Sequence, residues 1–138
     1  GGKMDWIYLI GRVLFSLIFL LSGVSHFTQL DAMSKYAASS GVPAPKLSVA
    51  VSGLMVLAGG LSVLLGLYME IGALLIVLFL LPVAFMMHAF WKVGDPMQRA
   101  TQQAHFMKNV ALAGAAMILY WAVRMQGYGP FTLGEPLS

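Results

Sequence analysis

Long uncharged apolar runs dominate the chain, and the two clearest lie back to back. The stretch Ser48–Trp91 is 44 residues long and carries one charged residue, Glu70, which separates the uncharged runs Ser48–Tyr68 and Ile71–Trp91 of 21 residues each. A helix rises about 1.5 Å per residue, so each run spans roughly 30 Å, the thickness of a bilayer's hydrocarbon core. The pattern predicts a transmembrane helical hairpin, with spans at residues 47–68 and 71–91.

Two further apolar runs flank this hairpin, at residues 6–25 and 105–123. The chain is therefore predicted to be an all-α membrane protein, a single four-transmembrane-helix bundle over residues 4–125. Residues 1–3 precede the first methionine, and we expect them to be an expression-vector remnant. Residues 126–138 are rich in glycine and proline, which predicts an irregular tail.

The first and third connections are long, and each is expected to hold a short interfacial helix. In the first, Asp31 begins a segment whose apolar side, Met33, Tyr36 and Ala37, is expected to lie on the membrane interface. In the third, Asp95 and Pro96 form a good N-cap and first helical position. The polar segment 97–106 is predicted to run straight into the fourth span.

Two spans carry polar or small residues on one face, which in a membrane helix normally points at other helices. In the first span this face is Arg12, Ser16, Phe19, Gly23 and His26. The second span has glycines at a spacing of seven, Gly53 with Gly60 and Gly59 with Gly66, which predicts packing seams. The alanines and glycine of residues 111–116 predict a central position for the fourth span.

Composition agrees with this assignment and excludes several classes of function. The chain is 59% hydrophobic and 9% charged, with a mean hydropathy of +0.83, whereas about a quarter of the residues of a soluble domain are charged. A net charge of +3 is too small and scattered for nucleic-acid binding. The absence of cysteine excludes disulfides, thiolate metal sites and covalent c-type haem, and no flavin or nucleotide motif is present.

Histidines at one membrane depth are the main candidates for chemistry. His26, His88 and His105 all fall at helix ends on the side of the long connections. Their imidazoles could bind a metal or haem iron, or donate a hydrogen bond to a quinone or lipid head group. They are also typical of residues at the membrane interface whose polar tip is hydrated. No pair has the i, i+4 spacing of ligands on one helix, so no metal is assigned. Lys108 and Asn109 share the start of the fourth span with His105, and the five residues form the predicted site, beside Trp91.

Arg12 is the strongest single anomaly, because ionisable residues inside a membrane are costly and often functional. It lies about six residues into its span, roughly 9 Å along the helix axis, so its side chain can snorkel to the head groups. The alternatives are a helix-packing role and an anion site for lipid phosphate or a substrate. Arg12 is therefore kept among the candidate ligand-binding residues.

Several motifs, in order, resemble the DoxX family of membrane proteins. They are Gly11-Arg12 through His26-Phe27, Gly41 to Pro45, Gly59-Gly60 to Gly66, His88 to Trp91, and Phe106 to Asn109. The resemblance covers residues 7–120 and implies a four-helix bundle in the bacterial inner membrane. The family is named from subunits of a thiosulfate:quinone oxidoreductase, and other members are associated with redox-defence or quinone-linked complexes.

One departure from the family pattern concerns the second span. Many relatives carry a glutamate just before the Gly-Gly pair, and here Met55, Val56 and Leu57 fill that stretch. If that acid carries proton or metal chemistry in the family, this chain lacks it.

The sequence is compatible with two functions. The first is an accessory subunit of a redox-linked, quinone-associated membrane complex that binds a quinone or lipid head group between helices. Such a subunit is part of an enzyme only together with an oxidoreductase partner. The second is a non-enzymatic lipid-binding or scaffolding module, for which a homo-oligomer is one expected form. A transporter ranks last, because the middle of each span is almost entirely apolar.

Basic residues predict the orientation in the membrane. Connections one and three hold five, Lys35, Lys46, Lys92, Arg99 and Lys108, against Arg12, Arg124 and Lys3 on the other side. The excess of Lys and Arg marks the cytoplasmic side, so both termini are expected in the periplasm. A reporter fused after Ser138 should be active only in its periplasmic form, and activity of a cytoplasmic reporter there would reverse the assignment.

Overall fold

The computed structural model describes residues 2–137, and all regular structure in that part of the chain is helical. The elements are α1 (Lys3–Thr28), α2 (Leu30–Ser39), α3 (Pro45–Leu65), α4 (Met69–Met87), the 3₁₀ turn η1 (Phe90–Lys92) and α5 (Pro96–Gln126). Four of these segments, α1, α3, α4 extended through η1, and α5, are long and apolar enough to cross a membrane. The predicted class, an all-α membrane protein with four spans, is confirmed. Connection one holds the short helix α2, and the polar segment 97–106 of connection three runs straight into the fourth span as the first part of α5.

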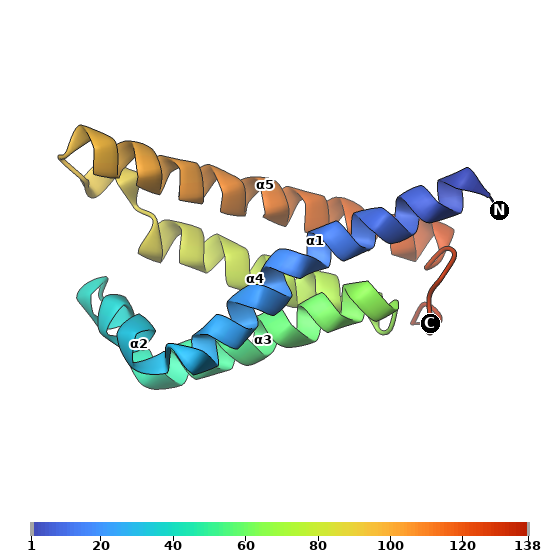
Figure 1. The fold of residues 1–138 in the computed structure, drawn as a ribbon, viewed down its shortest axis with the longest axis horizontal. Helices are drawn as coiled ribbons and strands as arrows, with labels where there is room; N and C mark the ends of the chain where they lie inside the picture. Colours follow the sequence, from blue (N-terminus) through green and yellow to red (C-terminus); the bar gives the residue numbers. More distant parts are fainter. Residues whose placement is uncertain (1, 138) are drawn as a thin grey trace.

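The four long helices run along the long axis of the molecule, and α2 is set at an angle at one end (Figure 1). The helix α1 packs on α3, α3 packs on α4, and α4 packs on α5. Both termini lie at the end opposite α2 (Figure 1). The long connections therefore share one end of the bundle, and the termini lie at the other, as the order of spans predicts.

The helix ends match the sequence pattern in some places and depart from it in others. Asp95 caps α5 as expected, since its carboxylate accepts a hydrogen bond of 3.0 Å from the backbone amide of Gln98. The helix α4 ends at Met87, four residues before the predicted Trp91. Phe90 and Trp91 are apolar enough to extend a span, but here they turn back and pack on Phe106 of α5, at centroid distances of 5.5 Å for both rings.

The predicted inward face of α1 is confirmed. The buried residues of this helix are Arg12, Ser16, Phe19, Gly23 and His26. Phe19 joins a core formed with Val56, Val63, Ile76, Leu80, Ala113 and Ala116. The prediction that the fourth span is central is wrong: α5 packs on α4 and η1, with Ala111 and Ala115 exposed, whereas α3 and α4 occupy the middle.

Glycines of α3 allow the close helix packing that the sequence predicts. A Cβ atom at Gly53 would lie 2.7 Å from Cβ of His26, and one at Gly59 would lie 2.7 Å from Cγ1 of Ile76. Both distances are too short for a real Cβ atom. The backbone of Gly53 therefore packs directly on His26 of α1, and the backbone of Gly59 packs directly on Ile76 of α4. The two faces of α3 hold its neighbours on either side.

Arg12 fastens the terminal end of the bundle. Its guanidinium donates to the carbonyls of Val63 and Leu64, in the last turn of α3, at 3.0 and 2.8 Å. It also donates to the carbonyls of Pro130 and Phe131 in the tail, at 3.0 and 2.8 Å. A cation at the C-terminal end of a helix satisfies orphan carbonyls and complements the helix dipole. Arg12 thus joins three segments that are distant in sequence.

The tail, residues 127–137, has no helix or strand, yet it is fixed by polar contacts. The Tyr128 hydroxyl donates to the buried carboxylate of Glu70 and accepts a hydrogen bond of 3.0 Å from the amide of Met69. The Leu137 amide donates to the other Glu70 oxygen at 2.5 Å, and Arg124 lies 3.7 Å from the same oxygen. Residues of the tail therefore form hydrogen bonds with Met69 and Glu70 at the start of α4.

Replacing Arg12 with alanine should destabilise the fold by about 2–4 kcal/mol, because carbonyls of α3 and the tail lose a charged donor in a buried position. Lysine at this position should recover only part of the loss, since it lacks the guanidinium fork. Unfolding in mixed detergent micelles measures the effect. The exposed Lys35→Ala control should stay within about 0.5 kcal/mol of wild type, and an equally neutral Arg12→Ala would refute the fastening role.

Tyr128 should make stability depend on pH in the alkaline range. Burial, followed by the hydrogen bond to Glu70, raises the pKa of Tyr128 from 10.0 to about 12. A raised pKa in the folded state means that the stabilisation is fully present below pH 10 and is lost as the pH rises toward 12. The difference in unfolding free energy between wild type and Tyr128→Phe should therefore shrink between pH 10 and 12; a constant difference would contradict the assignment.

Candidate functional site

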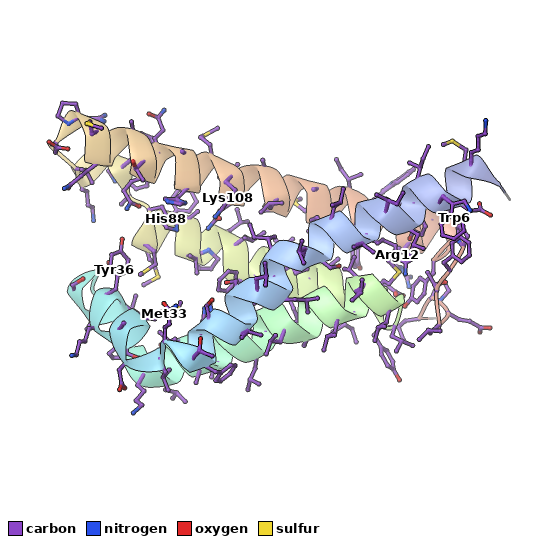
Figure 2. All side chains as sticks on the ribbon, in the orientation of Figure 1. Trp6, Arg12, Met33, Tyr36, His88 and Lys108 are labelled. Carbon is purple, nitrogen blue, oxygen red and sulfur yellow. The ribbon has the colours of Figure 1, made fainter. Side chains whose placement is uncertain are left out.

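A cavity of about 640 Å³ lies at the α2 end of the bundle. Residues from α1 to α5 all contribute to its wall, and most of them are apolar, including Met33, Met55, Phe79 and Pro82. Its polar residues include His26, His88, Lys108 and Asn109. In Figure 2, His88 and Lys108 lie at this end together with Met33 and Tyr36 of α2, far from Arg12 and Trp6.

His26 reaches the cavity wall because α1 and α3 pack closely. Gly53 leaves no side chain between its backbone and Cβ of His26. Nδ1 of His26 lies 2.6 Å from the carbonyl oxygen of Ser22, and the ring meets Phe79 edge-on with centroids 5.8 Å apart. A carbonyl only accepts hydrogen bonds, so Nδ1 carries the proton, and Nε2 of the neutral ring is an acceptor.

His88 follows directly after α4, and residues of α5 hold its ring. Its Nδ1 lies 2.8 Å from Oε1 of Gln102, so this nitrogen also donates. The ring stacks on His105, with centroids 5.1 Å apart and planes inclined by 29°. The position of His88 thus depends on two residues one helical turn apart on α5.

Asn109 is a largely buried polar residue of the cavity wall that has no hydrogen-bond partner among the described residues. Its side chain is 4% exposed, and no hydrogen bond to its amide occurs among residues 2–137. A buried amide without a partner costs about 1–3 kcal/mol, so a cavity-facing position favours a ligand that completes it. Lys108 lines the same cavity, whose described lining includes no carboxylate.

The structure does not bring all seven predicted residues together. His26, His88, Lys108 and Asn109 line the cavity, and His105 stands behind His88. Trp91 lies outside the lining, in an aromatic cluster with Phe85, Phe90 and Phe106. Arg12 lies at the opposite end of the bundle, where four backbone carbonyls accept its hydrogen bonds.

Sequence reasoning missed two polar residues of this end. Tyr36 was assigned to the lipid interface, but it lines the cavity, and its hydroxyl donates to the Met87 carbonyl at 3.3 Å. The reason is that α2 folds back along the end of α3, so its apolar side meets the cavity. Gln102 is three residues before His105 and seven before Asn109, a helical spacing that would have placed it on the same face.

This arrangement is suited to binding an amphiphile. Apolar walls accept a lipid-soluble ring or chain, Lys108 and Asn109 donate hydrogen bonds, and the imidazoles of His26 and His88 accept them. Among the described residues, no group of three His, Asp or Glu side chains is placed to hold a metal ion. The fold and cavity together define a small four-helix integral membrane protein with a cavity at the α2 end of its bundle.

Comparison with known proteins gives the family. The DoxX family model matches residues 7–89, which is more than half of the chain. The chain is 30% identical over 120 residues to the inner membrane protein YphA of Escherichia coli, covering 86% of this chain and 84% of that protein. It is 28% identical over 130 residues to the inner membrane protein YqjF of Escherichia coli, covering 94% and 91%. The chain belongs to the DoxX family; no solved structure matches it significantly.

Proposed function

We propose that this protein binds the head group of a quinone or phospholipid in the α2-end cavity, in the inner membrane of a bacterium. The single observation that carries the proposal is the buried amide of Asn109, which lines an apolar cavity and has no partner among the described residues. An oxygen-bearing head group would complete it. Two relatives of the chain are named as inner membrane proteins, which supports the location.

The dimensions of the cavity suit part of a lipid-soluble molecule. Pockets that bury small ligands usually measure about 300–1,000 Å³, and this one measures about 640 Å³. That volume admits a substituted ring or a head group with the first segment of its chain. Met33, Met55, Met86 and Met87 lie around it, and methionine side chains adapt to ligands of irregular shape.

We further propose that the protein acts as an accessory subunit of a redox-linked membrane complex. The chain has no cysteine and no flavin or nucleotide motif, so electron transfer would require a partner subunit. The support is membership of the DoxX family together with a site whose donors and acceptors suit a quinone. In this role the protein would position the quinone, and the partner would supply the redox centre.

A second candidate, a non-enzymatic lipid-binding or scaffolding module, rests on a different observation. Lys108 lines the cavity, and no carboxylate is among the described lining residues. An ammonium group without a neighbouring acid favours a phosphate diester, as in an anionic phospholipid. This candidate needs no partner subunit.

Extraction of the purified protein distinguishes the two candidates. Wild type should retain about one quinone, or one phospholipid of a single class, per chain after exchange into detergent. Asn109→Leu, and His88→Ala combined with Lys108→Ala, should retain about tenfold less, since they remove hydrogen-bonding groups of the cavity. Quantification uses mass spectrometry of organic extracts and the ultraviolet spectrum of the bound quinone.

Met107→Leu is the matched control, because Met107 is 53% exposed and precedes the site residues on α5. It should retain the ligand as wild type does. A bound quinone supports the redox role, and a single phospholipid class supports the lipid-binding role. If wild type and the cavity variants carry the same bulk phospholipid mixture and no quinone, the proposed site is wrong.

A further inference from the structure

A second cavity of about 610 Å³ adjoins the first at the same end of the bundle. The two share Tyr36, Met86 and Met87 as a common wall. The second cavity lies between the end of α2 and the start of α5, and its lining is more polar, with Ser39, Ser40, Lys92, Gln98, Thr101 and Gln102. It is called the outer cavity below, and the first is called the inner cavity.

One hydrogen bond connects the two cavities. Gln102 lines the outer cavity and His88 lines the inner one, and the bond of 2.8 Å between Oε1 of Gln102 and Nδ1 of His88 joins them. The amide oxygen accepts, so Nδ1 of His88 carries the proton. In a neutral imidazole the remaining nitrogen, Nε2, is then an acceptor, and His88 is part of the wall of the inner cavity.

In His26 the same nitrogen, Nδ1, carries the proton, but a backbone carbonyl accepts its hydrogen bond. Its Nδ1 donates to the Ser22 carbonyl at 2.6 Å, a backbone partner that no substitution of side chains removes. Both imidazoles that line the inner cavity therefore offer Nε2 as an acceptor. Of the two, only the state of His88 is set by a side chain, Gln102.

We propose that Gln102 is a positioning residue that sets the ligand specificity of the inner cavity, which selects head groups carrying hydroxyl donors. Two Nε2 acceptors require hydrogen-bond donors on the ligand, and Lys108 and Asn109 require oxygen acceptors. A hydroxyl-bearing head meets both demands, whereas one with carbonyl or ester oxygens alone leaves the imidazoles unpaired. The inference rests on the proposed binding of an amphiphile in this cavity.

Two lipid-soluble sources carry this chemistry, and each has a partner molecule that lacks the hydroxyls. A hydroquinone is its quinone reduced by two electrons and two protons, which convert both carbonyl oxygens into hydroxyls. Phosphatidylglycerol differs from phosphatidylmethanol by the glycerol hydroxyls at equal charge. A site that leaves buried acceptors unpaired discriminates against the molecule without donors.

The protonation of His88 can be measured without any ligand. In ¹⁵N-histidine protein in nanodiscs at pH 8, where an unperturbed imidazole is neutral, the Nδ1 signal of His88 should be of the protonated type. Its Nε2 signal should be of the unprotonated type. Gln102→Met, which removes the acceptor at similar length, should shift His88 toward the other tautomer. Gln103→Met, at an exposed neighbouring position, should change nothing, and His88→Gln assigns the signals.

Binding of matched probes then tests the specificity. Wild type should bind ubiquinol-1 about tenfold more tightly than ubiquinone-1, or phosphatidylglycerol about tenfold more tightly than phosphatidylmethanol. Gln102→Met should bring that ratio close to one, and Gln103→Met should leave it at the wild-type value. Equilibrium dialysis of the detergent-solubilised full chain measures each ratio under an inert atmosphere at pH 8.

The outcomes separate this inference from the proposed function. If wild type binds both members of a pair equally, or if His88 carries its proton on Nε2, the role of Gln102 is refuted while binding at the site stands. If wild type binds none of the four probes, the proposed function fails and the inference with it. A donor preference that Gln102→Met abolishes, together with the tautomer shift, supports both.

Discussion

Hydrocarbon supplies no hydrogen bonds, so a polar group that this chain places inside the bilayer is costly unless it has a partner in the protein or in a ligand. The hydroxyl of Ser16, buried in α1, has no partner among the described residues. The two ends of the bundle meet this constraint differently. At the terminal end, Arg12, Glu70 and Tyr128 are joined with backbone groups of α3, α4 and the tail in a buried polar network. At the other end, Asn109 is buried beside a cavity and has no hydrogen-bond partner among residues 2–137. The polar groups of the first end are therefore satisfied within the protein, and the second end is where the proposed ligand would bind.

Packing in the middle of the bundle connects these two ends. The glycine faces of α3 hold α1 on one side and α4 on the other, and Arg12 fixes the last turn of α3 to the tail. With α1 held in this way, its inward face runs from Arg12 at the terminal end to His26 on the cavity wall. The same register that satisfies Arg12 thus determines where His26 lies, and Gly53 sets how closely the imidazole approaches α3.

Sequence periodicity predicted the structural features that are determined within a single helix. The inward face of α1, the Asp95 cap and the four spans are local patterns, and the structure confirms them. Depth along each span likewise placed His26, His88, Lys108 and Asn109 at one surface. Contacts between segments were not predictable: the tail carbonyls that receive Arg12 belong to the backbone and leave no signature in residue type. Tyr36 faces the cavity because α2 folds back, which its own amphipathic pattern does not specify.

The chemistry of the cavity follows from which acids and bases its wall contains. The second span contributes Met55 to the wall, and the described lining includes no carboxylate. Acceptors in the inner cavity are then supplied largely by imidazole nitrogens, serine and tyrosine oxygens and the Asn109 amide, with Lys108 as the cation. Without an acid to pair with Lys108, charge balance falls to the ligand or to the membrane surface. The polar chemistry of the described wall is thus that of imidazoles, hydroxyls, one amide and one lysine, with no carboxylate base among them.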